Sequence, residues 1–133
     1  MRTSYKGKFK IDKHEFLMAL HFCFAYPELK REYNAMIGLS HNGQSEGGSG
    51  GIGDPTAKQA IRLSKISNRI DLIERTARNV CCNDPGLYPY LLRGVTEEGM
   101  SFDKLIAHGM PCGRKMYHVY RRKFYYFLVQ SLN

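Results

Sequence analysis

The fold is decided by residues 101–131, which read SFDKLIAHGMPCGRKMYHVYRRKFYYFLVQS. Ser101 is suited to cap a short helix, and Gly109 is suited to end it. A tight turn at 110–113 then leads into a longer helix that begins at Arg114. Two helices joined by a turn of three or four residues that contains glycine are typical of the helix-turn-helix motif. We therefore predict this motif at about 101–131.

The longer helix has an apolar side and a basic side. Large apolar side chains recur on it at helical spacing, namely Tyr117, Tyr120, Phe124 and Leu128. In a helix-turn-helix, the start of the second helix faces base edges in the major groove, and later cations hold phosphates. The residues predicted to face base edges are Arg114, Lys115 and His118. Phosphate contacts or steering are predicted for Arg121, Arg122 and Lys123. Tyr125 continues the spacing of the basic side and is expected to share it.

Positive charge is concentrated near the C-terminus. The 133 residues carry 20 Lys and Arg against 12 Asp and Glu, a formal net charge of +8. Residues 104–133 contain six of these cations and no carboxylate. A localised cationic surface attracts polyanions, so double-stranded DNA is the expected partner. An anionic membrane surface, a calmodulin-like protein partner and a merely solvated surface are the alternatives.

Two further helices are predicted before the motif. Asp54-Pro55 is a helix-start signal, and the apolar spacing after it predicts a long central helix that ends near Val80. Its apolar residues are Ala57, Ile61, Leu63, Ile66, Ile70, Ile73 and Ala77. Its cations, Lys58, Arg62, Lys65, Arg69, Arg75 and Arg78, are typical of a solvated helix surface. A third start signal at 83–85 predicts a short helix that Gly94 ends.

An N-terminal helical arm is predicted at 1–38. Asp12 and Glu15 have the spacing of a capping box, Pro27 fits the start of a second helix, and Gly38 is expected to close it. Residues 39–53 consist mostly of Gly, Ser, Asn and Gln, which is typical of a flexible linker. We therefore predict an all-α chain in which the arm is free to dock elsewhere and a helical DNA-binding domain occupies 54–133.

Other classes of function find little support in the sequence. No metalloprotease, P-loop or nucleophile-elbow motif is present, so we predict no enzyme and no cofactor. Cys81, Cys82, His108 and Cys112 match no recognised zinc pattern, so we predict no metal site, and an activated thiol at Cys112 is a weaker alternative. The four cysteines are expected to be reduced, in the cytoplasm. No apolar run is long enough to span a membrane, so no membrane partner is expected.

Three stretches resemble the RinA/ArpU-type late transcriptional regulators of phages and prophages. They are YPELKREY at 26–33, DPTAKQAIRL at 54–63 and GRKMYHVYRRKF at 113–124. The resemblance implies a C-terminal helix-turn-helix like that of sigma region 4 and activation of late phage genes. Contact with RNA polymerase and homo-oligomerisation are also expected. A phage terminase small subunit, or an interaction protein that binds no DNA, is the alternative function.

Overall fold

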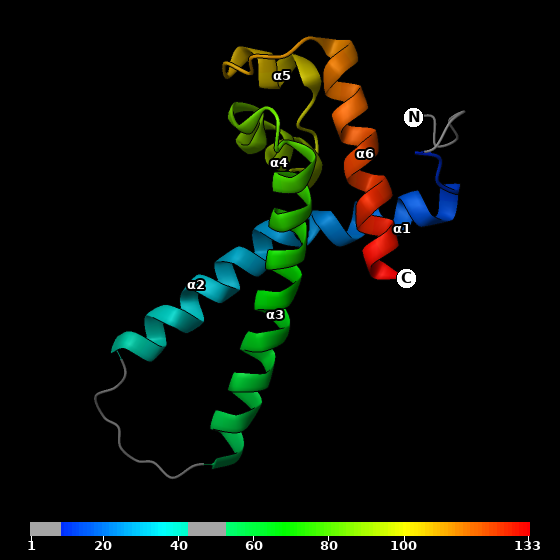
Figure 1. Ribbon diagram of the computed structural model, residues 1–133. Helices are drawn as coiled ribbons and strands as arrows, with labels where there is room; N and C mark the ends of the chain where they lie inside the picture. Colours follow the sequence, from blue (N-terminus) through cyan, green and yellow to red (C-terminus); the bar gives the residue numbers. More distant parts are fainter. Residues whose placement is uncertain (1–8, 43–52) are drawn as a thin grey trace.

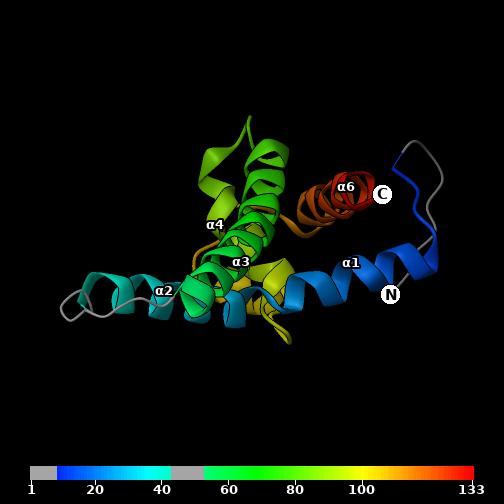
Figure 2. The same ribbon diagram turned by 90° about the horizontal axis from the view of Figure 1, so that it is seen from below.

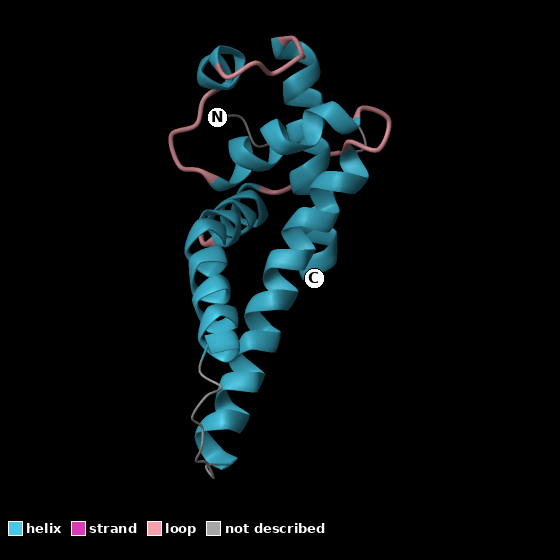
Figure 3. Cartoon of the chain, turned by 90° about the vertical axis from the view of Figure 1, so that its left-hand side faces the viewer, coloured by secondary structure: helices cyan, strands magenta, loops and turns pink. Residues whose placement is uncertain are grey.

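The computed structural model describes residues 9–42 and 53–133, and in these ranges the chain forms helices and no strand (Figures 1 and 3). The helices are α1 (Lys13–Phe24), α2 (Tyr26–Asn42), α3 (Gly53–Val80), α4 (Tyr88–Thr96), α5 (Phe102–Ala107) and α6 (Arg114–Leu132). A 3₁₀ turn at Pro85–Leu87 precedes α4. The predicted all-α class is confirmed. None of the described helices is long and apolar enough to cross a membrane.

Two helix starts agree with their capping signals, whereas the signal at 83–85 leads into the 3₁₀ turn, where Asp84 makes no capping bond, and α4 begins only at Tyr88. The Asp12 carboxylate accepts a hydrogen bond from the backbone N–H of His14 at 3.0 Å, and Glu15 accepts one from the N–H of Asp12 at 3.3 Å, which completes the capping box of α1. The Ser101 hydroxyl accepts from the N–H of Lys104 at 3.3 Å and caps α5. These side chains satisfy N–H groups that the first helical turn leaves without intrahelical partners.

Two glycines that were predicted to end helices lie inside them. Helix α2 continues past Gly38 to Asn42, and α4 continues past Gly94 to Thr96. A single glycine destabilises a helix by only about 1 kcal/mol relative to alanine, so packing of neighbouring helical residues can outweigh this cost. The predicted linker begins inside α2, and its central part, residues 43–52, lies outside the described residues.

The hydrophobic core draws on every helix, including the two of the predicted arm. Phe16, Ala19 and Cys23 of α1 are buried, and α1 packs against α4 and α6. Helix α2 packs along α3, and its Leu29 is buried there. Instead of standing free to dock elsewhere, the arm at 1–38 joins the 54–133 segment in one core through its described helices.

A polar contact reinforces the packing of α2 on α3. The Tyr26 hydroxyl donates a hydrogen bond to the Glu74 carboxylate, and Lys30 Nζ lies 3.4 Å from the same carboxylate. Burial of the Tyr26 phenol, followed by this hydrogen bond, raises the pKa of Tyr26, so the hydroxyl stays protonated as a donor. Glu74 therefore anchors the start of α2 to the C-terminal third of α3.

The helices extend to opposite ends of the molecule. In Figure 1, α5 and the start of α6 lie at the top, whereas α2 and the first half of α3 extend to the bottom. Seen from below in Figure 2, α1 and α2 follow one another along one side, and α3 and α6 lie on the other. The predicted helix-turn-helix therefore lies near the C-terminal end of α3.

Candidate nucleic-acid interface

Helices α5 and α6 form the two arms of the predicted motif, with a longer connection than expected. Helix α5 ends at Ala107, and Gly109 has φ of +101°, a left-handed conformation that favours glycine. The connection therefore spans 108–113 instead of the expected 110–113. Met110 is buried in this connection and packs into the core. The turn is thus held against the body of the molecule on its inner side.

Helix α4 meets α5 and α6 at Gly94. A Cβ atom on Gly94 would lie 3.1 Å from Leu105 Cδ1 of α5 and 3.2 Å from Tyr117 Cζ of α6, and it would collide with the Tyr117 hydroxyl. The ring of Tyr117 is buried and lies 5.8 Å from the ring of Phe102 between centroids. The absence of a side chain at Gly94 therefore lets three helices approach closely and sets the position of the first turn of α6.

The three residues predicted to face bases are all exposed. Arg114, Lys115 and His118 lie in the first five residues of α6. The Arg114 guanidinium lies 4.5 Å from the centroid of the Phe102 ring and 3.2 Å from the Asp103 carboxylate, both on α5. An ion pair this exposed contributes little to stability, so Arg114 can exchange it for another acceptor.

The basic side of α6 is exposed only in its first half. Tyr125 was expected on this side, but it is 1% exposed, because Phe16 of α1 packs against it with ring centroids 5.0 Å apart. Arg121 is half-buried and lies over the Tyr125 ring at 5.1 Å. Helix α1 therefore covers the second half of the face that Arg114 and His118 present to solvent, and Arg121 marks the boundary.

The predicted phosphate contacts are less exposed than the predicted base contacts. Arg122 and Lys123, like Arg121, are half-buried. Lys123 Nζ lies 5.5 Å from the centroid of the Phe9 ring, which itself packs on Tyr126 at 5.4 Å. Arg121 and Arg122 lie close enough to His118 to affect its ionisation. Lys123 is nine residues after Arg114 and therefore projects from nearly the opposite side of the helix. The six residues from Arg114 to Lys123 that were predicted from the sequence form what we call the α5–α6 surface.

Positive charge on this surface shifts the ionisation of His118. Partial burial of the imidazole, followed by the charges of Arg121, Arg114 and Arg122, lowers the pKa of His118 below its ordinary value of 6.5. The side chain is therefore neutral at pH 7 and presents one donor and one acceptor nitrogen. Three guanidinium groups acting on one imidazole also indicate a concentrated positive potential.

The structure gives the surroundings of the cysteines considered in the sequence analysis. Burial raises the pKa of the Cys112 thiol, the opposite of what an activated nucleophile needs. Burial also raises the pKa of Cys23 to about 12 and that of Cys81 to about 11. In the part of the chain that the structure describes, no three His, Cys, Asp or Glu residues gather closely enough to hold a metal ion.

Gly94 is the site-positioning residue that sequence reasoning missed. Leu91 and Val95 are both buried, and their four-residue spacing continues the apolar side of α4 across Gly94. That continuation was a signal that the helix does not stop there.

No protein-family model, curated protein or solved structure matches the chain. Function is therefore inferred from the shape and charge of the α5–α6 surface.

Proposed function

We propose that this chain binds double-stranded DNA sequence-specifically and regulates transcription, with the first half of α6 in the major groove. The observation that carries the proposal is that α6 extends beyond the cover of α1 with Arg114, Lys115 and His118 exposed. An α-helix fits the major groove, where each base pair has its own pattern of donors and acceptors. The absence of carboxylates from 104–133 favours a polyanion as ligand.

Each residue of the α5–α6 surface has a role in this proposal. Arg114 leaves Asp103 and donates two hydrogen bonds to a guanine edge, for which its planar guanidinium is suited. Lys115 contacts an adjacent base or phosphate, and His118 uses its neutral imidazole as donor or acceptor. Arg122 and Lys123 hold the phosphate backbone, and Arg121 contributes charge from its half-buried position.

The resemblance to the RinA/ArpU-type regulators extends the proposal to late genes of a phage or prophage. In that setting, we propose that the DNA-bound chain also contacts RNA polymerase, either alone or as a homo-oligomer. A terminase small subunit would use the same kind of DNA contact but assemble as a large ring. The mass of the protein in solution separates the two functions, because a monomer or dimer is expected of the regulator.

The direct test is selection of duplex DNA from a random pool with the wild type and with Arg114→Ala. We expect the wild type to enrich one motif and the variant to lose preference at one base pair, a loss of about 1–3 kcal/mol against the wrong base. Arg75→Ala is the matched control, because Arg75 is also an exposed arginine in an ion pair, with Asp71 at 2.7 Å on α3. A pool without an enriched motif contradicts sequence-specific binding.

The proposed phosphate binding is tested by salt dependence. For the double variant Arg122→Ala with Lys123→Ala, the slope of log K against log [salt] is expected to fall by about 0.9 for each phosphate that is no longer neutralised. Binding to specific and random duplexes should weaken alike, because phosphates carry no sequence information. The double variant Lys58→Ala with Lys65→Ala on α3 is the control. An unchanged slope in the first variant removes this pair from the binding surface.

A further inference from the structure

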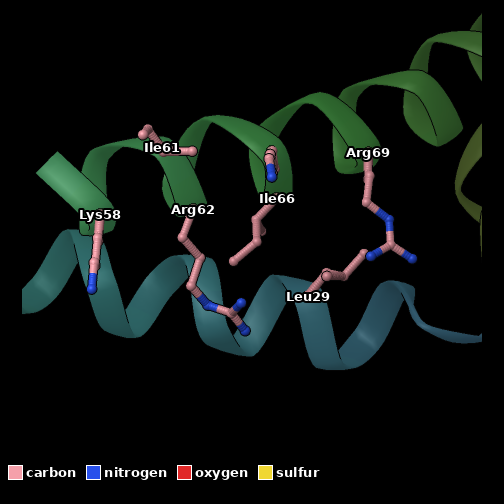
Figure 4. Close-up of a pocket in the computed structure, with 7 residues that line it drawn as sticks. Leu29, Lys58, Ile61, Arg62, Ile66 and Arg69 are labelled. Atoms are coloured by element: carbon pink, nitrogen blue, oxygen red, sulfur yellow. The ribbon is translucent and has the colours of Figure 1, made fainter.

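A groove of about 390 Å³ runs along the flank of α3 beside α2, at the end of the molecule away from α5 (Figures 1 and 4). Its lining residues are Leu29, Lys58, Ile61, Arg62, Lys65, Ile66 and Arg69. Figure 4 shows Lys58, Arg62, Ile66 and Arg69 extending from α3 toward α2, and Leu29 extending from α2 toward α3. Four cations and three apolar side chains therefore line one concave surface.

The cations form a single row along α3. They follow one another at intervals of four, three and four residues, which keeps them within one flank of the helix over about 16 Å. Arg62 forms an ion pair with Glu32 of α2, and Arg69 lies 5.1 Å from the centroid of the Phe22 ring. Within residues 9–42 and 53–133, Lys58 and Lys65 have no carboxylate partner and are exposed.

Ile61 lies beside this row and is 57% exposed, the most exposed large apolar side chain among those described. It was expected on the apolar side of the long helix with Ile66. Five residues at 100° per residue place Ile61 about 140° from Ile66 around the helix axis, so it cannot share the buried side. Ile61 is three residues after Lys58 and four before Lys65, so it lies on the same flank of α3 as these lysines.

We propose that the groove binds an acidic amphipathic helix of a partner protein. Carboxylates spaced three and four residues apart on that helix would match the row of cations, and apolar side chains beside them would cover Ile61 and the lysine and arginine stems. The Arg62–Glu32 pair shows that one cation of the row already binds a carboxylate. The proposal concerns a second surface and does not depend on what the α5–α6 surface binds.

Two other occupants fit the groove less well. A DNA backbone could neutralise the cations but would leave Ile61 without an apolar partner. A second copy of this chain carries a net charge of +8, which disfavours its approach to a row of cations. An acidic helix satisfies both the charge of the row and the exposed isoleucine.

A displayed library of peptides randomised at every position is the probe that tests the proposal. We expect the selected peptides to carry Leu, Ile or Phe at helical spacing with Asp or Glu three and four residues apart beside them. NMR shift changes on binding should centre on Ile61, Ile66 and Leu29. Ile61→Asp, and the pair Lys58→Glu with Lys65→Glu, are each expected to weaken peptide binding about tenfold or more.

Matched controls separate the groove from charge in general. Ile106→Asp changes another exposed isoleucine, on α5, and Lys115→Glu reverses a charge on α6; neither should alter peptide binding. Ile61 and the two lysines are exposed, so their variants are expected to fold, which circular dichroism checks. Selected peptides without acidic residues, or shift changes outside the groove, overturn the proposal. So does loss of DNA binding or of self-association on Ile61→Asp, because either assigns the groove to another occupant.

Discussion

His118 is the residue whose ionisation reports most directly on the α5–α6 surface. Its pKa lies below 6.5 in the folded protein, so the unfolded chain binds a proton first as the pH falls. The contribution of His118 to stability is therefore lost progressively below pH 6.5, down to its lowered pKa. We expect His118→Gln to lose less stability than the wild type on acidification over that range, measured by denaturant unfolding.

The same imidazole reports DNA binding. Phosphates near His118 would favour its charged form, so we expect a duplex to raise the pKa of His118 in an NMR titration of the ring signals. The backbone amide signal of His14, on α1 outside the α5–α6 surface, is the internal control and should not move when DNA is added. If DNA binds and the His118 titration does not change, this residue does not lie at the interface.

Sequence spacing put His118 and Tyr125 on one face of α6 but gave no sign of the helix that covers part of that face. His118 and Tyr125 are seven residues apart and lie on nearly the same face of the helix. One is exposed and the other buried, because α1, more than 90 residues earlier in the chain, crosses only the second half of α6. Helical periodicity depends only on nearby residues, whereas the point at which α1 stops covering α6 depends on residues far away in the sequence. The sequence therefore could not show that His118 is exposed and Tyr125 buried.

At the scale of the element, Gly94 in α4 has an unusual mutational sensitivity. Glycine to alanine inside a helix ordinarily stabilises it by about 0.5–1 kcal/mol. We expect Gly94→Ala instead to destabilise the protein by about 1–3 kcal/mol, because the new methyl group would displace the buried Tyr117 ring and crowd Leu105. Thermal and denaturant unfolding measure this difference.

Gly38→Ala in α2 is the matched control for that substitution. Nothing lies within 4 Å of a Cβ atom built at Gly38, so the ordinary helical preference should apply and the protein should gain about 0.5–1 kcal/mol. Gly94→Ala should also weaken DNA binding, since it disturbs the first turn of α6. A stabilising effect of Gly94→Ala would contradict the close approach of α4 and α6.

Helix starts were more predictable than helix ends. Caps such as Asp12 and Ser101 act on N–H groups two or three residues away, so a short stretch of sequence contains the whole interaction. Gly38 and Gly94 were predicted to end their helices because glycine is common at helix C-termini. Both helices continue past their glycine. In α4, the buried neighbours Leu91 and Val95 pack into the core and outweigh one unfavourable residue.

At the scale of the whole molecule, removal of residues 1–42 tests whether the arm belongs to the core. The sequence favoured a separable arm, but the structure buries Phe16 and Leu29 against α6 and α3. Each large apolar side chain buried in this way contributes about 1.5–3 kcal/mol. We therefore expect the 43–133 fragment to melt at a clearly lower temperature or without cooperativity.

A peptide of residues 9–42 added to this fragment provides the complementary measurement. If the arm completes the core, the peptide should bind the fragment and raise its melting temperature as the peptide concentration increases. A peptide with Phe16→Asp is the control and should have little effect, because Phe16 is buried against Tyr125. A fragment that melts like the full chain would instead support the separable arm that the sequence favoured.

The straight run of α3 fixes a distance between two surfaces. Its 28 residues make a rod of about 42 Å, with the groove beside its first half, the C-terminal part of α6 packed along its second half, and α5 and the start of α6 beyond its C-terminal end. From the middle of the groove to Val80 is about 24 Å, the length of about seven base pairs. A protein held in the groove would therefore lie at a fixed distance from DNA bound at the α5–α6 surface, and the length of α3 would set that distance.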